Sequence, residues 1–427
     1  MVKRRGACNP MSTQKSREQE GVKNNAGERM RVPLWFLFWN FLKIGCIAFG
    51  GFTALVAVVE NDMVRKRNLL KTEDMLDGIS LAMLLPGPMA VNVVAFVGYR
   101  LRGGVGALVS AFGVILPSFF LLIGLSHVYF NYGEIPTVSK AFAGFVPAVT
   151  AIIINTAWGM GKKAIKGWPE FIMGLAAALV LLGIGGFYIT LMIIFGAGLV
   201  GLAVNGRRHA PSGKPVVRDY ASEKGFGFSK ITFFVSLALL VIFLILFSVP
   251  LPGLGQDSLA RIFVTFSGMS LMLFGGGFVF IPLIQEIVVD GLHWVTQTEF
   301  TSAIAMGQIT PGPILISAAF IGYKIRGLVG AALATFAIFF PPALLMVNAS
   351  RILDRIKGSQ RVQSALTGIR AAVVGMVFAA AVVIGRGCEF HWVTLVIFAG
   401  CMVALLKFHI DIVWIIPVSG LAGMLSY

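Results

Sequence analysis

The amino-acid sequence predicts an all-α polytopic membrane protein with about thirteen transmembrane segments, arranged as two homologous repeats that we expect to be inverted and to contain broken helices. Apolar residues make up 57% of the chain and charged residues 13%, which is far from the composition of a soluble globular domain. Thirteen stretches are apolar over enough residues to cross, or nearly cross, a hydrocarbon core of roughly 30 Å. Short motifs containing glycine and proline also recur at a nearly constant spacing, which indicates an internal duplication.

The apolar stretches divide the chain into a tail, two repeats and a linker. Residues 1–33 are polar, and we expect them to form a disordered cytoplasmic tail without a cleaved signal peptide. We expect the first repeat at 34–205, a cytoplasmic linker at 206–230 and the second repeat at 231–427. The expected spans are 34–59, 75–99, 104–131, 141–160, 168–186, 187–205, 231–249, 262–289, 300–323, 327–349, 364–384, 391–406 and 411–426.

The distribution of basic residues predicts the orientation of the chain. The net charge is +16, but the basic residues lie in loops between apolar stretches, so we expect a lipid bilayer rather than a nucleic acid as partner. With a cytoplasmic amino terminus, 24 of the 35 Lys and Arg residues fall on the cytoplasmic side and nine outside, as expected for a multi-pass protein of the inner (plasma) membrane. Two groups disobey this bias: Arg65, Lys66, Arg67 and Lys71, and then Lys324 and Arg326. Either the first span is a hairpin that returns to the cytoplasm, or these charges serve a purpose other than topology.

Paired motifs show which positions of the two repeats correspond. "AFGGF" at 48–52 and "LFGGG" at 273–277 are offset by 225 in the numbering, and so are the two Pro-Gly-Pro motifs at 86–88 and 311–313. "GYRLRGGVGA" at 98–107 then pairs with "GYKIRGLVGA" at 322–331 at an offset of 224. The first repeat begins with span one and the second with span eight, so matching helices are expected to cross in opposite directions, as in many secondary transporters.

The Pro-Gly-Pro motifs predict a break near the middle of an apolar stretch. A broken helix frees backbone N–H and C=O groups that lipid cannot satisfy, so each break must face protein or a water-lined cavity. The restarted helix presents free N–H groups and the positive end of its dipole, which suits an anion. Asn92 and Ser317 hold matching positions one turn further on and are candidates for additional hydrogen bonds to a ligand. A kink that improves packing is the alternative role of the breaks, and close helix packing is the alternative role of the FGG glycines.

Ionisable residues form a second set of candidates. Lys43 and Arg370 fall within spans, where an ionisable group is costly and indicates a functional site, although Lys43 can also reach the interface. Glu60 and Glu286 lie near the ends of the FGG-bearing spans and are candidates for charge or proton coupling, with solvated loop charges as the alternative.

A matched set of four basic residues stands where spans end. A guanidinium presents a rigid fork of donors that suits tetrahedral oxyanions, so these residues are candidates for attracting anions at both mouths of a pathway. Anchoring of helix ends at the membrane interface is the alternative role. The set comprises Arg100, Arg102, Lys324 and Arg326.

Motifs of other function classes are missing from the sequence. The five histidines and four cysteines show no metal-ligand spacing, and the chain contains no phosphate-binding loop, nucleophile elbow or zinc-protease motif. We therefore expect no enzymatic activity, no cofactor and no metal.

Taken together, "FLKIGCIAFGG" and "LLPGPMAVNVVAFVGYRLRGG", followed by "LFGGGFVFIPLI" and "ITPGPILISAAFIGYKIRG", resemble the chromate ion transporter family. The resemblance covers nearly the whole chain from about residue 34, apart from the linker. It implies secondary active export of chromate from the cytoplasm, with sulfate as a related oxyanion, driven by the membrane potential or the proton gradient. The family's functional positions then fall on Phe49, Gly50, Gly51, Pro86, Gly87, Pro88, Arg100 and Arg102, and on Phe274, Gly275, Gly276, Pro311, Gly312 and Pro313.

Two other functions stay open from the sequence alone. One is export of a different small organic or inorganic anion, and the other is a membrane scaffold without transport of its own. A scaffold has no need for two matched helix breaks. The oligomeric state is also open, with a homodimer as one candidate.

Overall fold

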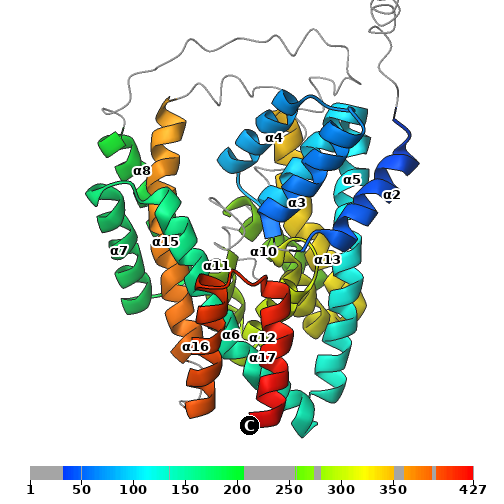
Figure 1. Cartoon of the computed structure of the whole chain (residues 1–427). Helices are drawn as coiled ribbons and strands as arrows, with labels where there is room; N and C mark the ends of the chain where they lie inside the picture. The colour runs from blue at the N-terminus through cyan, green and yellow to red at the C-terminus, as the bar shows by residue number, and fades with distance from the viewer. Residues whose placement is uncertain are drawn as a thin grey trace, which may run out of the picture. The chain divides into compact units, whose positions relative to one another are not determined.

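A computed structural model of the chain (Figure 1) describes residues 32–49, 51–133, 135–205, 255, 257–273, 280–350, 360–386 and 391–426. Every regular element among these residues is a helix, which confirms the predicted all-α fold class. The expected linker at 206–230, the expected span at 231–249 and nearly all of the tail lie outside the described residues. The helices of the first repeat are α2 (Leu34–Ile47), α3 (Gly51–Glu60), η1 (Asn61–Lys66), α4 (Thr72–Leu84), α5 (Met89–Tyr132), α6 (Pro136–Ala164), α7 (Trp168–Gly183) and α8 (Phe187–Asn205). Those of the second are α10 (Leu259–Leu271), α11 (Phe280–Gln285), η4 (Glu286–Gly291), α12 (Gln297–Ile309), η5 (Ile314–Ile316), α13 (Ser317–Ala349), α15 (Gln360–Arg386), α16 (Trp392–Leu406) and α17 (Ile412–Ser426).

Several of these helices are apolar enough to lie in a bilayer. Four are also long enough to cross it: Met89–Tyr132, Pro136–Ala164, Ile314–Ala349 and Arg361–Arg386. Shorter apolar helices of 10–17 residues accompany them, among them Leu34–Ile47, Trp168–Gly183 and Leu259–Leu271. The protein is therefore a multi-pass membrane protein.

Helix boundaries recur along the chain in step with the sequence motifs. The first residues of α2 and α10 differ by 225 in the numbering, and so do those of α4 and α12. The first residues of α6 and α15, and of α7 and α16, differ by 224. The single missing residue falls between the second Pro-Gly-Pro motif and residue 322, where the chain starts with the 3₁₀ turn η5. A 3₁₀ turn rises about 2.0 Å per residue against about 1.5 Å in an α-helix, so fewer residues cover a similar length.

The Pro-Gly-Pro segment of the first repeat is a helical hairpin rather than a single span. Arg100 of α5 forms an ion pair with Asp74 of α4, and the Phe96 ring lies against Gly78. In one continuous helix, residues 74 and 100 would be about 39 Å apart, at about 1.5 Å per residue. The chain therefore turns back at residues 86–88, which form the tip of the hairpin. Lys324 of α13 pairs with Glu299 of α12 in the matching arrangement of the second repeat.

A second reversal follows each of these hairpins. Within α5, Arg102 and Gly103 are non-helical, and Gly103 has a φ of 67°. Gly98 and Gly106 come so close that a Cβ on either would lie 2.3 Å from the other's carbonyl oxygen. The remainder of α5, from residue 104 to 132, is about 43 Å long and can cross a bilayer. In α13, Arg326 and Gly327 form the same reversal, with φ values of −142° and 58°.

The FGG segment of the first repeat also folds back on itself. Asn40 of α2 donates from Nδ2 to Asp62 just after α3, over 2.6 Å, and Arg67 lies 4.8 Å from the centroid of the Phe36 ring. Leu34 and Lys66 thus lie toward the same end of a hairpin that turns after the end of α2 at Ile47 and before the start of α3 at Gly51. In the second repeat, Phe266 of α10 stacks on Trp294 after η4, with ring centroids 6.2 Å apart. Four segments that the sequence suggests as single spans, 34–59, 75–99, 262–289 and 300–323, therefore fold back instead.

The two Pro-Gly-Pro hairpins start from opposite ends of the long part of α5. Arg102 begins that part, whereas Tyr129 and Phe130 near its end pack on Phe320, with ring centroids 5.2 and 4.8 Å apart. Phe320 lies in the turn of α13 before the reversal at Arg326. The first arms α4 and α12 have 13 residues each and are about 20 Å long, so each arm spans about half the length of residues 104–132. The Ser118 hydroxyl, in the middle of that part of α5, donates to the carbonyl of Pro311 at the second tip.

The last two helices of each repeat pack on the other repeat. α7 and α8 pack along α15, and α16 and α17 pack along α6 (Figure 1). Glycines allow these close approaches, since a Cβ at Gly375 would overlap the carbonyl of Gly174, and one at Gly423 would lie 2.8 Å from the Cα of Gly144. Helices α2–α8 of the first repeat and α10–α17 of the second are therefore interlocked in space although they are consecutive in sequence.

Candidate functional site

The tips of the hairpins from the two repeats are joined by backbone hydrogen bonds. Gly87 and Gly312 have φ values of 105° and 117°, which an L side chain rarely adopts. The Gly87 N–H donates to the carbonyl of Leu273 over 2.7 Å, and the Gly312 N–H donates to the carbonyl of Ala48 over 3.0 Å. Leu273 and Ala48 immediately precede the two FGG motifs. Each Pro-Gly-Pro tip is therefore bonded to the FGG hairpin of the other repeat.

These bonds change the hydrogen bonding at the end of α4. In a continuous helix the Gly87 N–H would donate to the carbonyl of Met83, and the flanking prolines have no N–H at all. Because the Gly87 N–H is directed to Leu273, the Met83 carbonyl is left free. Arg370 of α15 donates to this carbonyl from Nη2 over 3.2 Å. The break thus brings a guanidinium to the end of the first arm.

Free backbone donors lie on the other side of each break. Pro88 and Pro313 precede the restarted helices and give no side-chain cap. The N–H groups of Ala90 and Val91, and that of Leu315 in the second repeat, have no hydrogen-bond partner among the described residues. All three residues are buried. The positive ends of two helix dipoles therefore point into the protein near the tips.

Asn92 and Ser317 brace the breaks from inside. Asn92 donates from Nδ2 to the carbonyl of Pro86 over 3.1 Å, and its Oδ1 atom is buried without a partner in the described part of the chain. The Ser317 hydroxyl donates to the carbonyl of Ile314 over 2.7 Å. Both side chains are fully buried. Each side chain thus donates to a carbonyl at the break, and the predicted role of both as ligand donors stays a prediction.

The four matched basic residues lie at the bases of the hairpins, about 20 Å from the tips at about 1.5 Å per residue. Arg100 and Lys324 are paired with Asp74 and Glu299. Arg326 donates from Nε to the carbonyl of Asp257 over 2.7 Å. For the half-buried Arg102, the described residues provide no hydrogen-bond or ion-pair partner. The Pro-Gly-Pro motifs therefore lie at the hairpin tips, whereas the four matched basic residues lie at the hairpin bases.

The FGG motifs are described only in part. Phe49 is exposed over 40% of its surface, and Gly51 begins α3. Gly50 and the whole second motif, Phe274, Gly275 and Gly276, lie outside the described residues.

Comparison with known proteins assigns the chain to a family. The chromate transporter family model matches residues 35–202 and again residues 260–424. The chain belongs to the chromate transporter family. The two matched regions start at residues 35 and 260, which differ by the same 225 positions as the paired motifs. The family resemblance inferred from the motifs is therefore confirmed.

Individual relatives agree with this assignment. The probable chromate transport protein of Synechococcus elongatus is 27% identical over 350 residues, which cover 81% of this chain and 83% of the relative. The chromate transport protein of Cupriavidus metallidurans is 26% identical over 399 residues, or 92% of each chain. The uncharacterized transporter YwrA of Bacillus subtilis is 29% identical over 140 residues, which cover 32% of this chain and 79% of that protein. No solved structure matches the chain significantly.

The remaining ionisable candidates of this transporter lie in different surroundings from one another. Lys43 is exposed on α2, and Glu60 pairs with Arg65 over 3.4 Å near the end of α3. Glu286 accepts a hydrogen bond from the Gly186 N–H over 2.6 Å. This last contact connects the hairpin return of the second repeat to the turn between α7 and α8.

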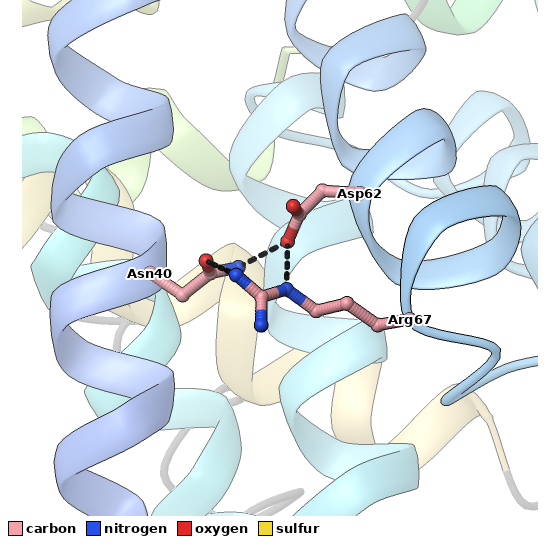
Figure 2. Close-up of polar contacts among 3 residues, drawn as sticks. All are labelled: Asn40, Asp62 and Arg67. Carbon is pink, nitrogen blue, oxygen red and sulfur yellow. Dashed lines mark hydrogen bonds and ion pairs between the residues drawn. The ribbon is translucent and has the colours of Figure 1, made fainter.

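Sequence reasoning missed one polar cluster in the transporter (Figure 2). Asn40 donates to Asp62 and accepts from Arg67 over 3.3 Å, and Arg67 also pairs with Asp62 over 3.0 Å. Asn40 is only 7% exposed, and an amide in the apolar helix 34–47 was the available signal. Arg67 is one of the basic residues that did not follow the predicted charge bias, and it lies in the returning part of the FGG hairpin.

Possible metal ligands are not clustered in the described part of the transporter. Within those residues, no group of three or more His, Cys, Asp or Glu side chains is placed to hold a metal ion.

Proposed function

We propose that this protein is a secondary active transporter that exports chromate, or a related tetrahedral oxyanion such as sulfate, from the cytoplasm, driven by the proton motive force. The family assignment and the names of the relatives from Synechococcus and Cupriavidus support chromate as the cargo. The observation that carries the proposal is that each Pro-Gly-Pro tip is hydrogen-bonded to the FGG hairpin of the other repeat.

The chemistry around the tips suits an oxyanion. A tetrahedral oxyanion without bound protons accepts hydrogen bonds and donates none. Buried N–H groups at Ala90, Val91 and Leu315 are free among the described residues, and helix amino termini favour negative charge. A cargo held between two hairpins that enter from opposite ends can be exposed to either side in turn when one hairpin pair moves relative to the other.

Orientation forms part of the proposal. If the amino terminus is cytoplasmic, the first hairpin returns Arg65, Lys66, Arg67 and Lys71 to the cytoplasmic side. Four of the nine basic residues counted outside then join the 24 counted inside, which strengthens the positive-inside bias. The two repeats are inverted if residues 231–249 form the additional crossing between them.

Thiol labelling tests this topology. In a variant without the four native cysteines, single cysteines are placed by Lys66→Cys, Lys163→Cys and Thr137→Cys. We expect a membrane-impermeant thiol reagent to label the first two only in inverted vesicles and the third only in right-side-out vesicles. If Lys66→Cys is labelled from the same side as Thr137→Cys, the first segment crosses the membrane and the hairpin is wrong.

Uptake by inverted vesicles tests the transport function. Vesicles that contain the protein should accumulate chromate above empty controls, sulfate should compete, and a protonophore should abolish the uptake. Arg102→Ala should lower uptake about tenfold, because its guanidinium would no longer attract the anion to the mouth of the pathway. Arg386→Ala is the matched control, because the Arg386 side chain is exposed at the end of α15. Failure to accumulate chromate or sulfate would refute the proposal, and uptake of other anions alone in a competition panel would assign a different cargo.

A further inference from the structure

Arg370 is a charged residue that the rest of the fold does not explain. It is the only charged residue between Arg361 and Arg386 of α15, and α15 is one of the four helices long and apolar enough to cross the membrane. A charge at such a place is costly unless a partner compensates it. The described residues offer Arg370 one hydrogen bond, to the Met83 carbonyl, and no carboxylate pairs with it.

The hydrogen bond to the free Met83 carbonyl does not by itself explain why a charged residue stands at position 370. The second repeat contains the same break, in which the Gly312 N–H is directed to Ala48. The carbonyl of Gln308, the counterpart of Met83, is freed in the same way and has no partner among the described residues. The counterpart of Arg370 in the first repeat, at the offset of 224, is Val146. An apolar residue therefore stands at the position that matches Arg370, and a free carbonyl alone does not require a cation.

The position of Arg370 points instead to a mobile anion. Met83 is three residues before the Pro-Gly-Pro motif, so its carbonyl fixes the guanidinium near the first tip. A guanidinium carries five N–H donors in a fixed fork, and the Met83 carbonyl uses one of them. The remaining donors match the oxygens of a tetrahedral oxyanion, whose negative charge would replace the missing carboxylate.

We propose that Arg370 is the residue that recognises the charge of the oxyanion at the first Pro-Gly-Pro tip, and that the second tip supplies only neutral groups. This inference rests on the proposed transport function and deepens it. On this proposal the substrate site is asymmetric and contains one fixed positive charge. The Arg370 side chain is then responsible for selectivity for tetrahedral oxyanions over neutral solutes.

A pair of substitutions separates charge recognition from carbonyl capping. Arg370→Gln keeps a donor for the Met83 carbonyl but removes the charge, whereas Arg370→Lys keeps the charge. In inverted vesicles we expect Arg370→Gln to raise the KM for chromate or sulfate about tenfold or more, and Arg370→Lys to raise it less. Arg386→Gln, at the end of the same helix, is the matched control and should leave KM unchanged.

Binding to the purified protein provides a second readout. Sulfate should raise the thermal unfolding temperature of the wild type and of Arg370→Lys in detergent, but not that of Arg370→Gln. A variant that unfolds at the wild-type temperature without sulfate is correctly folded, so loss of the sulfate shift then reports on binding. An unchanged KM and sulfate shift in Arg370→Gln, or a stronger defect in Arg370→Lys than in Arg370→Gln, would overturn the inference while leaving transport intact. Absence of both uptake and sulfate binding in the wild type would instead overturn the proposed function, and the inference with it.

Discussion

In the first repeat, Asn40, Asp62 and Arg67 close the FGG hairpin with hydrogen bonds and an ion pair. The matching residues of the second repeat are Thr265, Ile287 and Leu292, and there the stack of Phe266 on Trp294 closes the hairpin. The same backbone path is therefore held by polar contacts in one repeat and by apolar contacts in the other.

Other features are shared by both repeats. A glycine with positive φ stands at each Pro-Gly-Pro tip and at each reversal after it, and an ion pair closes the base of each Pro-Gly-Pro hairpin. Backbone conformations with positive φ have few substitutes, because a Cβ strains them. A side-chain contact can be exchanged for another of similar energy. This difference explains why the glycines recur and the residues around them diverge.

The largest expected effect comes from the shared backbone at the tips. Gly87→Ala forces a Cβ to within 2.2 Å of Pro342 at a φ of 105°, and we expect it to destabilise the protein by about 2–5 kcal/mol. Gly312→Ala should cost less, because the nearest atom there is the Ser118 hydroxyl oxygen, 2.5 Å away, which can move by rotation about χ1 with loss of its hydrogen bond to the Pro311 carbonyl. Thermal unfolding of the purified variants measures both effects.

Gly124→Ala provides the matched control for these two substitutions, since a Cβ there meets no atom within 4 Å. Its unfolding temperature should stay at the wild-type value. Equal unfolding temperatures for Gly87→Ala and the wild type would contradict the geometry of the first tip.

A smaller effect is expected at the polar cluster of the first repeat. Asp62→Ala leaves the Asn40 amide and the Arg67 guanidinium without their shared acceptor, and we expect a loss of about 1–3 kcal/mol. The triple variant Asn40→Thr, Asp62→Ile and Arg67→Leu copies the second repeat and removes the amide, the carboxylate and the guanidinium together. It should be less destabilised than Asp62→Ala, because no amide or charged group is left unpaired and a threonine hydroxyl can donate to a carbonyl of its own helix. Thermal unfolding checks the order, and a triple variant less stable than the single one would show that the two ways of closing the hairpin are not interchangeable.

Much of this fold could be predicted from the sequence, for identifiable reasons. The composition indicated a membrane protein, and the paired motifs located the duplication, because glycine and proline mark the backbone features that each copy needs. The hairpins were harder to predict. A continuous apolar run such as 75–99 reads the same whether the chain crosses the membrane or turns back at Gly87, since apolar patterning reports burial and not direction.

The candidate site was also only partly predictable. The Pro-Gly-Pro motifs were identified as helix breaks, and the structure places both at hairpin tips. Arg100 and Lys324 were candidates for anion attraction, but Asp74 and Glu299 pair with them, a contact that depends on how α4 and α12 fold back. Arg370 was a candidate from its place in a span, yet only the structure shows that it reaches the Met83 carbonyl, 287 positions away in the chain.

The sequence by itself determined that the chain is helical, lies in a membrane, is duplicated and carries the motifs of its family, because these properties depend on composition and local backbone preference. The tertiary structure decided which segments turn back, that the last helices of each repeat pack on the other repeat, and which tip receives the guanidinium. Those features depend on contacts between residues far apart in the chain, and a local pattern does not specify the partner of a free carbonyl or of a charged side chain.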